Sequence, residues 1–158
     1  MSKGCILLLE DDLNVISDLE NGLRKALGGR YSIITVRAVK GAIEALNDTM
    51  DSITCFVLDL NMSAHGVAPD YVAECLGTYL TGWVFYRHYV LKSNLHKNST
   101  VIFRSAYVEE LLRDYVTSIP EQKMLFEQLK AKDCLFKKTD PDDIVINQVK
   151  LFLDGGGK

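Results

Sequence analysis

Short apolar runs alternate along this chain with longer segments in which apolar residues recur every three or four positions. The runs lie at residues 5–9, 31–36, 54–58, 100–103 and 134–136. Each run is too short for a buried helix and is bounded by charged or turn-forming residues. The pattern therefore predicts five strands.

The segments between these runs have the spacing of helices that bury one face. Gly28 and Gly29 supply a C-terminal stop for the first helix, and DPDD at 140–143 places acids and a proline at the start of the last one. We predict helices at residues 13–27, 39–46, 83–95, 109–116, 123–129 and 144–153.

Strands that alternate with helices and are apolar on both faces indicate a parallel sheet covered by helices on each side. Right-handed crossovers leave few topologies, and the pattern suits the α/β flavodoxin-like fold, a doubly wound (βα)5 sheet with strand order 2-1-3-4-5. No internal repeat or linker divides the sequence. We expect a single domain at residues 1–154 and a disordered tail at 155–158.

Composition excludes several classes of protein. A length of 158 residues, 47% hydrophobic and 25% charged, fits one globular domain. A net charge of -3 with scattered lysines and arginines argues against a nucleic-acid partner. The apolar stretch near the N-terminus is too short for a signal peptide or a membrane span, so we expect a cytoplasmic protein with no membrane partner.

The cysteines do not indicate a metal or redox site. Cys5, Cys55, Cys75 and Cys134 form no C-x-x-C pair, and three of them lie in apolar runs. A thiol in such a run behaves as a small hydrophobic side chain, so we interpret these residues as structural.

Polar residues follow the strands, at the edge of a parallel sheet where ligands bind. With the predicted strand order, Glu10 or Asp11 faces Asp59 across neighbouring strands. Carboxylates this close destabilise the fold unless a cation offsets them, and Mg²⁺ is the natural one because it binds a few carboxylate oxygens, a carbonyl and waters. With Lys137 and a hydroxyl nearby, Asp59 is suited to accept a phosphoryl group.

The motifs ILLLEDD, VLDLNM, VIFRSA and LFKK, in this order and at strand ends, resemble the response-regulator receiver domain of two-component signalling. The resemblance runs from Cys5 to Leu153. It implies that Asp59 is the phosphorylated aspartate, that Asp11 binds Mg²⁺ directly and that Glu10 binds it through water. The backbone carbonyl of Asn61 is implied to complete the metal shell.

The resemblance also implies that Ser105 hydrogen-bonds the phosphoryl group and that Lys137 pairs with it. Lys137 is chosen over Lys138 because its spacing to Ile144 fits the family. Lys138 stands where the family usually has proline, so a solvated lysine is the expectation there. We expect Asp11, Asp59 and Lys137 to share one cavity.

Other polar residues near these motifs have structural interpretations. We expect Asp12 to cap the first helix, His65 to be a surface residue, and Arg104 to extend its charged end into solvent. Ser105, taken alone, would be a turn residue.

Three departures from the family pattern stand out. Gly82 matches the glycine that opens the third helix, so residues 64–81 are an insertion after the third strand, with helical spacing that predicts a short extra helix near the site. It could shield the site, bind a partner or serve packing alone.

The segment between the fourth and fifth strands is extended around residues 117–130. Cys134 occupies the usual position of a switching aromatic residue, for which Tyr107 could substitute.

These features favour a stand-alone response regulator receiver. It would accept a phosphoryl group from a histidine kinase or phosphotransfer protein and signal by noncovalent binding to an unknown downstream protein. Because it would only phosphorylate itself and slowly lose the group, we do not expect an enzyme. The alternative is a phosphorylation-independent adaptor that binds partners through its inserted helices. A haloacid-dehalogenase-type phosphatase is disfavoured because its second acid would fall at Asn61.

Overall fold

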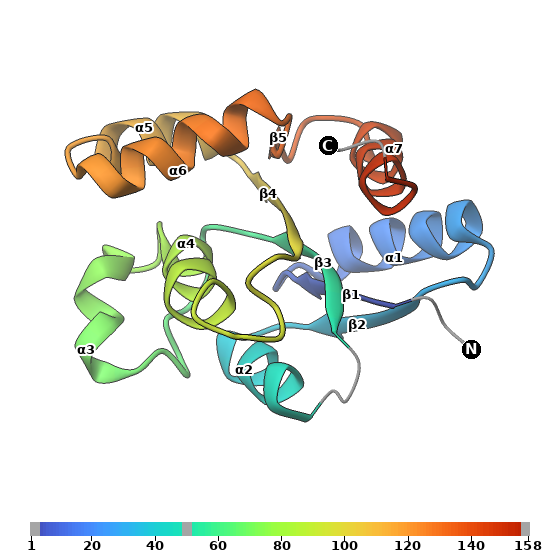
Figure 1. Cartoon of the computed structure of the whole chain (residues 1–158), viewed down its shortest axis with the longest axis horizontal. Helices are drawn as coiled ribbons and strands as arrows, with labels where there is room; N and C mark the ends of the chain where they lie inside the picture. The colour runs from blue at the N-terminus through green and yellow to red at the C-terminus, as the bar shows by residue number, and fades with distance from the viewer. Residues whose placement is uncertain (1–3, 49–51, 156–158) are drawn as a thin grey trace.

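The computed structural model describes residues 4–48 and 52–155. Within them, five parallel strands form one sheet in the order β2-β1-β3-β4-β5 (Figure 1). The predicted flavodoxin-like order is therefore confirmed. The strands are β1 (Cys5–Leu9), β2 (Ser32–Val36), β3 (Ile53–Leu58), β4 (Thr100–Ser105) and β5 (Leu135–Lys137).

The predicted helical segments are helical, with one difference, and the short extra helix predicted in the insertion is present. The helix expected at 83–95 is α4 (Thr81–Phe85) continued by a π-helical turn, η2 (Tyr86–Val90). The insertion contains α3 (Pro69–Val72) and a 3-10 turn, η1 (Ala73–Cys75). The other helices are α1 (Leu13–Leu27), α2 (Val39–Asp48), α5 (Val108–Val116), α6 (Pro120–Ala131) and α7 (Asp142–Leu153).

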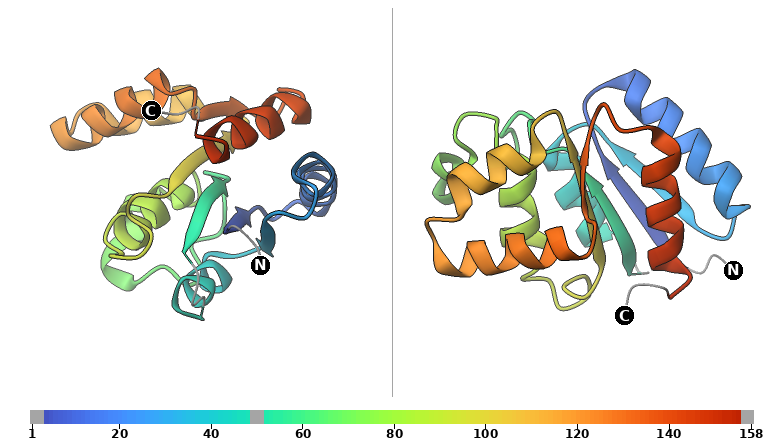
Figure 2. Two further views of the ribbon diagram at one scale, coloured as in Figure 1. Left: turned by 45° about the vertical axis from the view of Figure 1, so that its right-hand side comes forward. Right: turned by 90° about the horizontal axis from the view of Figure 1, so that it is seen from above.

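Helices cover both faces of the sheet, as Figure 2 shows from two sides. Side chains alternate along a strand, so in β1 Leu7 and Leu9 join the core beneath α2, α4 and α5. Ile6 and Leu8 join the core beneath α1 and α7. Burial on both faces explains why the central strands β1 and β3 are nearly continuous apolar runs.

The first helix has the ends that the sequence predicts. Asp12 Oδ1 accepts hydrogen bonds from the N–H groups of Asn14 and Val15, so this side chain is the expected cap. At the other end Gly28 has φ 57°, a left-handed conformation that costs glycine little. The cap fixes the direction in which the chain leaves β1, and therefore the place of the acids before it.

The segment between β4 and β5 forms a helical hairpin of α5 and α6, which Figure 1 shows to one side of the sheet. The predicted tail at 155–158 lies outside the described residues except for Gly155. In the part of the chain that the structure describes, no helix is both long enough and apolar enough to cross a bilayer.

Candidate functional site

The carboxyl ends of β1 and β3 bring two acids together. Leu9 is in register with Leu58, and the Asp59 N–H donates to the Leu9 carbonyl at 2.9 Å. Glu10 and Asp59, the residues that follow the two strands, are only 7% and 2% exposed. Neighbouring parallel strands thus end in two buried carboxylates on the same rim of the sheet.

Asp11 adds a third carboxylate, which is exposed. One oxygen from each of Glu10, Asp11 and Asp59 lies within 4.8 Å of the others. Such a set of carboxylate oxygens, open to solvent on one side, fits a magnesium site, because Mg²⁺ prefers oxygen ligands and retains several waters. The structure therefore brings Glu10, Asp11 and Asp59 together on the rim of the sheet.

The ammonium group beside these acids belongs to Lys138. Its Nζ lies 2.8 Å from Asp59 Oδ2 and 3.1 Å from Glu10 Oε1. Lys137 extends toward α5, where its Nζ lies 3.2 Å from Glu110 Oε1. The prediction that Lys137 lies in the acidic cavity is therefore wrong, as is the expectation that Lys138 is a solvated lysine.

The physical reason is the alternation of side chains along a strand. Lys137 is the last residue of β5, in register with Ser105, and its side chain lies on the face that carries α5. Lys138 is the first residue beyond the strand, and its N–H donates to the Ser105 carbonyl at 3.2 Å. Alternation could have signalled that two adjacent lysines point apart, but the spacing to the next helix did not show which one turns inward.

Burial and charge act in opposite directions in this cluster. Burial raises the pKa of Glu10, the Asp59 charge raises it further, and hydrogen bonds from the Asp12 N–H and from Lys138 offset only part of the rise. Burial works to lower the pKa of Lys138, but its hydrogen bond to Asp59 and the charges of Asp59 and Glu10 together raise it. One ammonium therefore stays charged in contact with two acids, and Asp11 adds a third acid within 4.8 Å of both.

Asn61 and Ser105 lie on the same rim. The Asn61 N–H donates to Asp59 Oδ1 at 3.1 Å, and Asn61 Oδ1 accepts from Thr78 Oγ1 at 2.6 Å. Ser105 is 1% exposed, and its Oγ has no hydrogen-bond partner among the described residues. The metal role of the Asn61 carbonyl and the phosphoryl role of Ser105 stay predictions. The contact of Thr78 with Asn61 was not foreseen, and no local pattern in the sequence indicates it.

Gly82 holds the start of α4 against residues 59 and 60, which follow β3. A Cβ atom at this position would lie 2.0 Å from the Asp59 carbonyl oxygen, so no larger residue fits without moving the backbone. The Gly82 N–H donates to the Leu60 carbonyl at 3.1 Å. The match of Gly82 to the glycine that opens the third helix thus has a steric basis.

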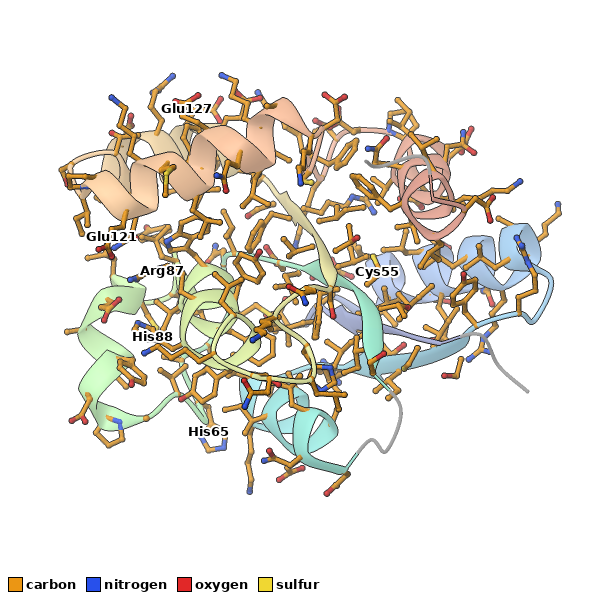
Figure 3. The ribbon with its side chains drawn as sticks, viewed as in Figure 1. Cys55, His65, Arg87, His88, Glu121 and Glu127 are labelled. Carbon is orange, nitrogen blue, oxygen red and sulfur yellow. The ribbon has the colours of Figure 1, made fainter. Side chains whose placement is uncertain are left out.

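The insertion is fastened mainly to η2 and not to the acids. Glu74 Oε2 lies 2.8 Å from Arg87 Nη1 and 3.0 Å from His88 Nε2, and the rings of Tyr71 and His88 stack at 3.8 Å. Figure 3 shows Arg87 and His88 on the side of the molecule that carries α3. Contact with Asn61 and Met62, which follow β3, runs through Thr78 and Thr81 at the end of the insertion.

The remaining candidates lie outside the acidic cluster. His65 is exposed in the loop before α3 (Figure 3), and Tyr107 is exposed just before α5. Cys134 is buried, and burial raises the pKa of its thiol to about 11, as expected of a structural cysteine. Arg104 is buried and paired with Asp142 at 2.6 Å, so the prediction that it reaches solvent is wrong.

Comparison with known proteins gives a likeness in structure. No protein-family model matches this sequence, and no curated protein matches it. A sensor protein from Polaromonas sp. JS666 superposes with a TM-score of 0.65 at 18% identity, over 96% of this chain and 97% of that one. The signal receiver domain of a putative Luxo repressor protein from Vibrio parahaemolyticus gives 0.59 at 16% identity, over 96% and 90%. The chemotaxis response regulator CheY4 of Vibrio cholerae gives 0.59 at 13% identity, over 93% and 96%.

This chain has the receiver-domain fold. The likeness spans nearly the whole of this chain and of those three. In the receiver fold of this chain, the ends of β1 and β3 carry the three acids, and the loop after β5 carries the lysine that meets them. These three acids offer carboxylate oxygens that could hold a metal ion.

Proposed function

We propose that the chain accepts a phosphoryl group on Asp59 from a histidine kinase or phosphotransfer protein, in a reaction that requires Mg²⁺. The observation that carries the proposal is the position of the Lys138 ammonium, 2.8 Å from the buried Asp59 carboxylate within a cluster of three acids. A purely structural strand end has no need of three clustered acids, two of them paired with one lysine, because the like charges destabilise the fold.

The chemistry is a transfer in which Asp59 is the nucleophile. An Asp59 carboxylate oxygen forms a bond to phosphorus while the bond from phosphorus to the donor's imidazole nitrogen breaks. The imidazole leaves with that electron pair and takes up a proton from water. Because a phosphoryl group spreads negative charge over three oxygens, the reaction needs mainly alignment and positive charge.

Each rim residue has a part in this proposal. Glu10, Asp11 and Asp59, with the Asn61 carbonyl, would hold Mg²⁺, which supplies positive charge to the phosphoryl oxygens when bound. Lys138 would release its contact with Asp59 Oδ2 and pair with the incoming group. The buried Ser105 hydroxyl, which has no partner among the described residues, is available to donate a hydrogen bond to a phosphoryl oxygen.

Incubation with acetyl phosphate and Mg²⁺, followed by intact-mass measurement, tests the proposal. We expect a gain of one phosphoryl group that is lost on chelation of the metal and absent from Asp59→Ala. Lys137→Met is the matched control for Lys138→Met, because Lys138 contacts Asp59 whereas Lys137 contacts Glu110. A mass gain that survives Asp59→Ala, or no gain in the unmodified protein, would contradict the proposal.

The second candidate is a phosphorylation-independent adaptor. It is favoured by a cavity of about 410 Å³ between the insertion, α4 and the α5–α6 hairpin, whose apolar lining includes Leu76, Trp83, Tyr115 and Ile119. If a partner were recovered equally well with Asp59→Ala and with unmodified protein, after incubation of both with the phosphoryl donor, this second function would be preferred.

A further inference from the structure

Arg104 is a buried cation next to the candidate site. It lies in β4 immediately before Ser105 and is 5% exposed. Its Nη2 pairs with Asp142 Oδ1 at 2.6 Å and donates to the backbone carbonyls of Asp140 at 3.1 Å and of Lys138 at 3.4 Å. A single side chain in the sheet thus holds the loop between β5 and α7 at two points and the first residue of α7 at a third.

Burying Arg104 in this way has a cost in folding free energy. The Nε and Nη1 atoms of Arg104 are buried and find no acceptor among residues 4–48 and 52–155. A buried guanidinium with unused donors loses hydration that its ion pair does not fully replace. Arg104 also lines a cavity of about 10 Å³ together with Glu10 and Asp59.

The backbone of Lys138 is fixed on both sides by consecutive residues of β4. The Ser105 carbonyl accepts from the Lys138 N–H at 3.2 Å, and the Arg104 guanidinium donates to the Lys138 carbonyl. The direction of a side chain follows from the orientation of its two flanking peptide groups. These contacts therefore fix the direction of the Lys138 side chain, which extends toward Asp59 and not toward α5.

We propose that Arg104 is a positioning residue for Lys138: it orients the loop so that the Lys138 ammonium reaches the acceptor carboxylate. The inference rests in part on the proposed function, because the value of a well-placed ammonium is greatest in phosphoryl transfer. The placement itself is independent of that reaction and is measurable without it.

A double-mutant cycle between Arg104→Gln and Lys138→Met tests the inference. The rate of phosphorylation of Asp59 by acetyl phosphate is followed at a temperature where circular dichroism shows every variant folded. We expect Arg104→Gln to slow the reaction about ten-fold when no other residue is substituted, and to have almost no further effect in the Lys138→Met background. Rates of coupled residues deviate from additivity by roughly a few-fold to a hundred-fold.

The same substitution in the Lys137→Met background is the matched control and should slow the reaction as much as in the unmodified protein. Arg104→Lys keeps a cation and should recover part of the rate. A role of Arg104 in folding alone would lower the unfolding temperature equally in every background and leave the rate additive. An equal slowing by Arg104→Gln with and without Lys138 would overturn the inference.

The cycle is also run on thermal unfolding, which separates this inference from the proposed function. If the unmodified protein takes up no phosphoryl group, the function is refuted, and the unfolding cycle decides the inference. We then expect the shift in unfolding temperature caused by Arg104→Gln to be smaller in Lys138→Met than in Lys137→Met. Equal shifts would refute the positioning role.

Discussion

Replacing Lys138 with Met is the sharpest test of the electrostatics of the site. The ammonium lies 2.8 Å from one buried carboxylate oxygen and 3.1 Å from another. With an effective dielectric constant of about 20, these contacts correspond to gross attractions of roughly 6 and 5 kcal/mol. The desolvation of the three charges and the ordering of a long side chain offset much of this.

The net loss on removing one partner of a buried ion pair is about 3–5 kcal/mol. Lys138 has a side-chain exposure of 29%, which favours the lower end of that range, or about 3 kcal/mol. A domain of this size loses about 2–4 °C per kcal/mol, so the unfolding temperature of Lys138→Met should fall by about 6–12 °C at neutral pH with a chelator present.

Thermal unfolding followed by circular dichroism measures this loss, with Lys137→Met as the control. Lys137 is an exposed residue whose contact with Glu110 lies at the surface, so its replacement should change the unfolding temperature very little. Equal shifts for the two variants, or no shift for Lys138→Met, would refute the assignment of the ammonium to position 138.

Three further predictions concern the acids and the glycine beside them. Mg²⁺ at about ten times its dissociation constant should stabilise the protein by about 1.4 kcal/mol, or a few degrees in unfolding temperature, and Asp11→Asn should remove most of this gain in the same melting assay. Because the pKa of Glu10 is raised, ionising this acid in the folded, metal-free protein carries a penalty that grows as the pH rises from 4.5 through the pKa of the folded state. The free energy of unfolding should therefore increase relative to that of Glu10→Gln as the pH falls toward 4.5. An opposite trend would count against the burial of this acid. Gly82→Ala, whose Cβ would lie 2.0 Å from the Asp59 carbonyl, should lower the denaturant midpoint and slow phosphorylation, whereas unchanged values would show that the loop yields freely.

Much of the fold follows from local pattern. The run at Cys5–Leu9 is apolar on both faces because both faces are buried, and the strand has the predicted bounds. Asp12 and Gly28 mark the ends of α1 through capping interactions that depend only on neighbouring residues. Strand order then follows from the handedness of crossovers, which leaves few alternatives.

Features set by distant contacts were not predictable in this way. The π-helical turn η2 places three consecutive residues against the insertion: Arg87 and His88 contact Glu74, and the Tyr89 hydroxyl accepts from the Ala68 N–H at 2.8 Å. A wider turn spreads consecutive side chains over a smaller arc than an α-helix does. Five residues are too few for the apolar spacing to distinguish the two forms of helix.

The candidate site shows the same division. Its acids could be placed from the sequence because the ends of neighbouring parallel strands share one rim. The choice between Lys137 and Lys138 depends on how the chain turns after β5, and contacts with Arg104 and Ser105 hold that turn. Residues that act on a loop from another strand leave no trace in the loop's own sequence.

Locating the phosphoryl group on the chain shows whether Asp59 accepts it. The protein is treated with acetyl phosphate and Mg²⁺, and borohydride then reduces any aspartyl phosphate to homoserine, which peptide mass spectrometry assigns to a position. We expect homoserine at position 59 and none when the metal is chelated. Homoserine at another aspartate, with Asp59 intact, would contradict it.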